Sequence, residues 1–98
     1  MAEIELLTVE NTRIAGKKAD RQRLSWLIRV ADLDYRKQVE VLWAGEDRLW
    51  HSVAARYQSR SGGGYEHWLA ETICTETPDR PLPGTVYFVA RLVCQNRD

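Results

Sequence analysis

Hydrophobic residues recur at every second position along much of this chain. In residues 24–30 the side chains of Leu24, Trp26, Ile28 and Val30 share one parity, and residues 39–43 repeat the pattern. Residues 86–94 alternate in the same way, with apolar residues in both sets. A period of two predicts β-strands, and the third run reads as a strand buried on nearly both faces.

Weaker alternation predicts further strands at residues 4–9, 53–57 and 65–72. Breaks fall at a turn over 44–47, a glycine-rich loop over 59–64 and a loop over 78–84 that holds all three prolines. A basic, polar stretch from 13 to 23 separates the first two expected strands. We therefore predict an all-β fold, an antiparallel β-sandwich of seven or eight strands. The side chains expected inside it are Ile28, Val30, Val39, Val41, Trp68, Phe88 and Ala90.

The length of the chain indicates a single domain, and its net charge disfavours binding to nucleic acid or membranes. The 98 residues fit one domain, 1–98, with no linker or repeat, and 14 basic residues balance 14 acidic ones. Zero net charge removes the long-range attraction toward nucleic acid or anionic membranes. The acidic first residues lack the pattern of a signal peptide, so we expect a cytoplasmic protein whose Cys74 and Cys94 are reduced thiols. A disulfide between them is the alternative.

Catalytic and metal-binding patterns are weak in this sequence. The histidines and cysteines lack the spacing of a zinc site, and no spacing selects a catalytic pair among the carboxylates. The three glycines at 62–64 are followed by no lysine and helix, so they do not form a phosphate-binding loop. The basic residues between 13 and 23 have no interleaved aromatic residue. We expect a protein that is no enzyme, with no cofactor, metal site, nucleic-acid partner or membrane partner.

Aromatic residues are the more informative set, because several fall at predicted loop edges. Tyr35 follows a turn, Trp50 follows the turn after Gly45, and Tyr65 follows three glycines. Such a ring presents a flat, rigid face on which the apolar side of a sugar can lie. For Trp50 a plug at the end of the sandwich is an equal alternative. Trp26, Trp43 and Trp68 share the parity of core residues.

The order of several short motifs resembles carbohydrate-binding module family 21, which includes starch- and glycogen-binding modules. The strand ending in Val30-Ala31-Asp32-Leu33, followed by Tyr35-Arg36-Lys37-Gln38-Val39, is similar to the opening of those modules. The likeness continues through four further segments. These are Asp47-Arg48-Leu49-Trp50, Ala54-Ala55-Arg56-Tyr57, Tyr65-Glu66-His67-Trp68 and Val86-Tyr87-Phe88-Val89-Ala90.

This resemblance implies an immunoglobulin-like β-sandwich that binds α-1,4-glucan without cleaving it. By position, Trp50 matches one sugar site of the family, with Phe88 as its partner. Tyr35 and Tyr65 match a second site, with Lys37 as a nearby polar contact. Members of the family usually close with an aromatic–Asp–Asn–Asn sequence, whose aromatic residue is missing after Cys94 in this chain. The resemblance therefore favours the Tyr35 and Tyr65 site. The alternative function is a module of the same fold that binds a protein partner and has lost its sugar.

Overall fold

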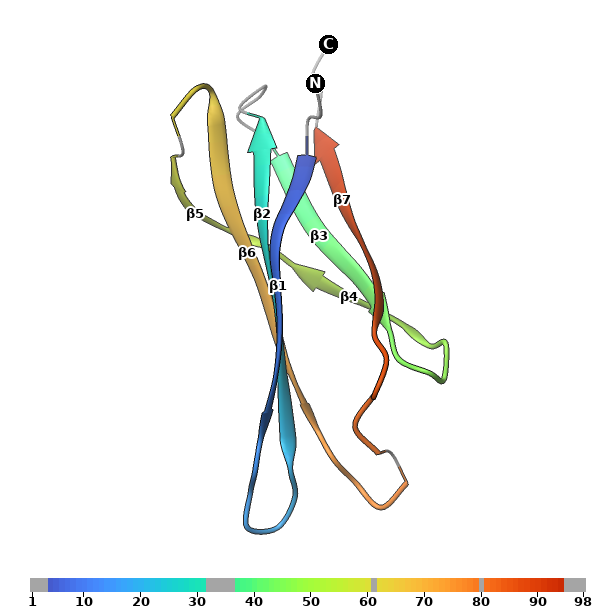
Figure 1. Ribbon diagram of the computed structural model, residues 1–98. Helices are drawn as coiled ribbons and strands as arrows, with labels where there is room; N and C mark the ends of the chain where they lie inside the picture. The colour runs from blue at the N-terminus through green and yellow to red at the C-terminus, as the bar shows by residue number, and fades with distance from the viewer. Residues whose placement is uncertain (1–3, 32–36, 61, 80, 95–98) are drawn as a thin grey trace.

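In the part of the chain that the structure describes, seven antiparallel strands form two sheets (Figure 1). The structure, a computed structural model, describes residues 4–31, 37–60, 62–79 and 81–94. The strands are β1 (Ile4–Ile14), β2 (Arg21–Ala31), β3 (Lys37–Ala44), β4 (Trp50–Ala54), β5 (Arg56–Arg60), β6 (Tyr65–Thr75) and β7 (Tyr87–Cys94). One sheet has the order β1-β2-β6-β5 and the other β4-β3-β7. The predicted antiparallel β-sandwich is confirmed.

The core lies between the sheets and is built from the predicted alternation. On β2 the side chains of Leu24, Trp26, Ile28 and Val30 are buried, and they meet inward residues of the facing β3. The predicted interior residues of β3, Val39 and Val41, are buried with them, while Trp68 and Ala90 are half-buried against the same cluster. Burial of these branched and aromatic side chains supplies most of the stabilisation of the fold.

Phe88 differs from its prediction as an interior residue. Its ring contacts the core, with its centroid 5.9 Å from that of Trp26, but 37% of the residue is exposed. The reason is the position of β7 at the edge of its sheet, where no strand of the described chain covers its outer side. The sequence pattern indicates which way Phe88 faces but not which strand forms the edge.

The predicted strand at 53–57 is in fact two strands that belong to different sheets. The chain leaves the three-stranded sheet after β4 and enters the four-stranded sheet with β5. Ala55, at the crossing, is buried, and its backbone N–H donates to the carbonyl of Val39 at 2.7 Å. The crossing between the sheets is therefore part of the core and is tied to β3.

The first hairpin is longer than predicted. β1 continues to Ile14 and β2 begins at Arg21, so the basic stretch contributes paired strand ends and only a short connection remains. Gln22 is buried there, and its side-chain amide donates to Asn11 Oδ1 at 2.6 Å and to the carbonyl of Pro83 at 3.2 Å. The second of these bonds joins the hairpin to the proline-containing loop before β7.

The glycine-rich turn between β5 and β6 has a conformational explanation. Gly62, Gly63 and Gly64 all have positive φ angles, of 44°, 69° and 84°. Residues with a Cβ atom rarely adopt this region, whereas glycine enters it freely. The three glycines therefore allow the tight reversal that starts β6 at Tyr65.

Candidate functional site

The outer face of the three-stranded sheet carries two exposed aromatic rings in one row. Trp50 on β4 pairs with Ala44 on β3, and Ala44 pairs with Tyr87 on β7. Because paired residues share a face, both rings project from the side of the sheet away from the core. Trp50 is 56% exposed and Tyr87 43%, while Ala44 between them is fully buried. The small residue leaves room for the two flanking rings to present their surfaces.

The guanidinium group of Arg48 lies against one of these two rings, that of Tyr87. Its guanidinium carbon lies 4.9 Å from the centroid of the Tyr87 ring, a cation–π geometry. The turn that places it has Arg48 at φ 62°, and its backbone N–H donates to the carbonyl of Gly45 at 3.1 Å. We call Trp50, Tyr87 and Arg48 the aromatic platform. It combines flat apolar surfaces with a charged hydrogen-bond donor.

Polar side chains continue the same face beyond the platform. The next rows across the sheet are Ser52–Leu42–Val89 and Ala54–Glu40–Arg91. Ser52 Oγ donates to Glu40 Oε2 at 3.2 Å, and Arg91 forms an ion pair with the same carboxylate. These groups are solvent-accessible, so they can exchange water for hydroxyl groups of a ligand. The face therefore offers rings for stacking and hydroxyl partners within a few residues.

The acidic residues near the aromatic platform bond to the backbone of the loops around it. No group of three histidine, cysteine or acidic side chains in the described part of the chain could hold a metal ion. Glu46 stabilises the loop before β7, because its carboxylate accepts hydrogen bonds from the backbone N–H groups of Gly84 and Thr85 at 3.1 Å. Asp47 Oδ1 likewise accepts from the N–H of Leu49. The acidic residues near the platform thus shape its loops.

Phe88, the expected partner of Trp50, lies on the opposite face of the sheet. It pairs across the strands with Trp43, whose side chain is in the core, whereas Tyr87 stands in the row of Trp50. The sequence pattern does not single out Tyr87, because Tyr87 and Phe88 both belong to an apolar strand. The alternation of β7 contains the needed signal, but using it requires knowing which β3 residue lies beside each β7 residue.

The residues of the second predicted site are dispersed. Tyr35 lies outside the described residues. Tyr65 is half-buried on the outer face of the four-stranded sheet, with the guanidinium carbon of Arg29 4.7 Å from its ring centroid. Lys37 instead has a side chain only 3% exposed, and its Nζ lies 3.4 Å from Glu66 Oε1. That oxygen also accepts a hydrogen bond from Trp68 Nε1 at 3.1 Å.

The Lys37–Glu66 ion pair is expected to matter for stability. Replacing Lys37 by methionine should lower the unfolding free energy by about 3–5 kcal/mol, because the Glu66 carboxylate would remain buried without its cation. Urea denaturation measures this loss, and adding Glu66→Gln should recover part of it. Arg23→Met, which breaks an exposed ion pair with Glu71, is the matched control and should cost at most about 1 kcal/mol. Equal losses at both sites would contradict the assignment.

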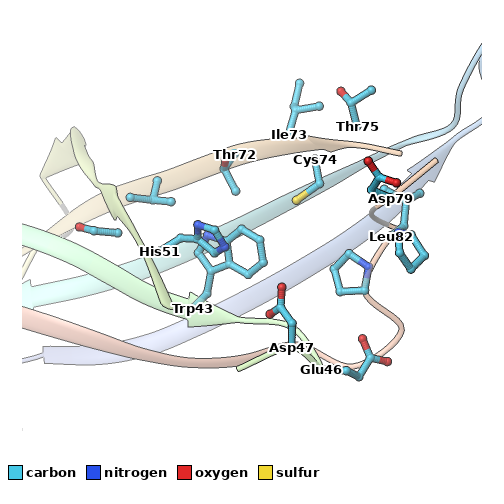
Figure 2. Close-up of a pocket in the computed structure, with 15 residues that line it drawn as sticks. Trp43, Glu46, Asp47, His51, Thr72, Ile73, Cys74, Thr75, Asp79 and Leu82 are labelled. Carbon is cyan, nitrogen blue, oxygen red and sulfur yellow. The ribbon is translucent and has the colours of Figure 1, made fainter. Parts of the chain in front are cut away.

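A hollow between the two sheets forms a second concave feature (Figure 2). It encloses about 540 Å³, with Thr72 and Cys74 on β6 along one wall and Trp43 and His51 on the other. The Trp43 and His51 rings stack with centroids 4.6 Å apart. Burial raises the pKa of the Cys74 thiol, which keeps it protonated. Cys74 is a free thiol, as predicted for it. The side chain of Cys94, for which the same state is predicted, lies outside the described residues.

Comparison with known proteins identifies the fold. No family model and no curated protein matches the sequence. Among solved structures the chain has the fold of starch-binding carbohydrate-binding modules of family 21, as the sequence resemblance predicted. A circularly permuted member of that family matches with a TM-score of 0.61 and 20% identity over 93% of this chain and 76% of that one. The second match is the starch-binding domain of Rhizopus oryzae glucoamylase in complex with β-cyclodextrin and maltoheptaose. Its TM-score is 0.56 and its sequence identity 20%, over 90% of this chain and 84% of that one.

In the parts of the chain that the structure describes, no helix has the length and apolar character needed to cross a membrane.

Proposed function

We propose that this protein binds α-1,4-glucan chains without cleaving them, through the aromatic platform. The observation that carries the proposal is the exposed row of Trp50 and Tyr87 on a solvated sheet face. The fold supports it, because the similar glucoamylase domain is described in complex with β-cyclodextrin and maltoheptaose.

Each ring of the platform would stack against the apolar C–H face of one glucose unit. Arg48 at the rim, and Ser52 in the next row, would exchange hydrogen bonds with sugar hydroxyls. A shallow surface of this kind holds little of a ligand, so a single unit should bind weakly. Longer chains should bind better, because several contacts act together.

Tyr65 and Tyr35 remain our proposed second contact for the same polymer. Tyr65 supports a binding role through its position on the outer face of the four-stranded sheet, beside the Arg29 cation. A chain long enough to reach both faces would gain from a second contact through its high local concentration.

The test is titration of the wild-type protein with maltoheptaose and β-cyclodextrin, followed by calorimetry and by tryptophan fluorescence. We expect saturable binding that shifts the emission of Trp50, retention on insoluble starch and glycogen, and no retention on cellulose. Incubation with soluble starch should release no reducing sugar. Absence of binding to every α-glucan would refute the proposal and favour the alternative, a module of this fold that binds a protein.

A further inference from the structure

The edge formed by β7 differs from the other three sheet edges of the described chain. β4 and β5 are five residues long, and the pairing of β1 and of β5 contains a register shift. β7 runs for eight residues in unbroken register with β3, and Arg91 is its one charged residue. Short length, irregular pairing and charge are what normally keep an exposed edge from accepting another strand. β7 has the least of this protection.

The core beside this edge is incompletely covered. Leu6 and Val9 on β1 pair with the buried Ile28 and Trp26, so they face inward, yet they are 37% and 41% exposed. Phe88 faces inward from β7 and is 37% exposed. β1 and β7 lie side by side at the same flank of the sandwich (Figure 1). The flank between them therefore exposes apolar side chains directed toward the core.

We propose that β7 of a second copy of this chain pairs antiparallel with β7 along this edge. The two three-stranded sheets then form one continuous sheet of the order β4-β3-β7-β7-β3-β4, with a two-fold axis through its centre. Backbone N–H and C=O groups of every second β7 residue face the free edge and would be satisfied by the partner strand. The same pairing brings inward-facing apolar residues of each copy over the uncovered flank of the other.

The residues of β7 favour a second copy over an unrelated strand. A two-fold register centred on Ala90 places Phe88 opposite Leu92 and keeps both on the core side. The same register places Arg91 opposite Val89, so the arginines of the two copies do not lie opposite each other. Arg91 is already paired with Glu40 of its own chain. The zero net charge of the whole protein adds no repulsion between copies.

Sedimentation velocity and light scattering, over a concentration series without sugar, test this pairing. We expect a reversible dimer for the wild type. Val89→Lys sets lysine against Arg91 of the other copy at two symmetric places and should weaken the dimer roughly tenfold. Val89→Glu should strengthen the dimer, because glutamate would face Arg91 of the other copy. Since both variants change the same exposed position, opposite effects would come from the sign of the charge. Leu49→Lys, at a similarly exposed residue of the platform turn, is the control and should leave the dimer unchanged.

Two results would overturn the proposal. A wild-type protein that remains monomeric at the highest concentration excludes self-pairing. A dimer that Val89→Lys and Val89→Glu affect equally would have its interface elsewhere. Hydrogen exchange adds an independent readout, because amides of β7 that face the free edge should slow as the protein concentration rises.

Discussion

Replacing Trp50 and Tyr87 together by alanine should abolish retention on starch and leave the stability nearly intact. Aromatic anchors of a binding surface commonly contribute about 2 kcal/mol or more each, so losing both should lower the affinity roughly a thousandfold. Both residues project from the outer face and are largely exposed. Their truncation should therefore change the unfolding free energy by less than about 1 kcal/mol. Calorimetric titration with maltoheptaose measures the first effect and urea denaturation the second.

Phe88→Ala is the matched control for that experiment. It removes a ring from the residue next to Tyr87, but on the face that packs against Trp26. We expect it to reduce stability and to preserve glucan binding. If Phe88→Ala abolished binding while the double variant retained it, the sugar would lie on the other side of the sheet and the platform would be assigned to the wrong face.

Trp26→Ala should strongly destabilise the protein. The side chain is completely buried at the centre of the sandwich, between residues of both sheets. Truncating a buried tryptophan removes its apolar contacts and leaves a cavity, at a cost of about 3–5 kcal/mol. Small domains have about 5–15 kcal/mol of total stability, so much of it would be lost. A large fall in both the melting temperature and the urea midpoint is the expected result.

Trp50→Ala provides the reciprocal comparison with Trp26→Ala. The chemical change is identical, but Trp50 is more than half exposed. The exposed variant should lose binding and keep its stability, whereas the buried variant, where it remains folded, should keep binding. Similar losses of stability in the two variants would show that Trp50 plugs the sandwich, the alternative that its loop-edge position left open.

The interior of the central strands could be predicted from the sequence alone. Alternation assigns Trp26 and Ile28 to one face of β2 and Val41 to one face of β3, and all three are buried. This inference works because side chains of a strand alternate between faces whatever its neighbours are. A strand in the middle of a sheet has partners on both sides, so facing inward is sufficient for burial.

Features that depend on distant partners could not be predicted. Phe88 faces inward as its parity requires, yet it is exposed because β7 is an edge. The division of residues 53–57 into two strands at Ala55 could not be predicted either, because the pattern of apolar residues is the same whichever strand is the neighbour. Both facts depend on strand order, which is a property of the whole chain.

Of the two rings in the aromatic platform, only Trp50 could be predicted from the sequence. The exposure of Trp50 can be predicted because it follows a turn, where an aromatic residue has reason to be exposed. Tyr87 required the register between β3 and β7. Lys37 was expected at a sugar-binding rim, but the structure buries its ammonium beside Glu66, and a lone lysine at a strand start carries no local sign of such a partner.

The crossing at Ala55 has a consequence for how the molecule comes apart. Residues 50–60 form the edge of one sheet with their first half and the edge of the other with their second half. Peeling either edge strand away pulls on a buried junction that is bonded to Val39 in the middle of the core. We therefore expect fraying at one edge to be transmitted across the sandwich, so that the two sheets unfold together under heat, denaturant or mechanical load.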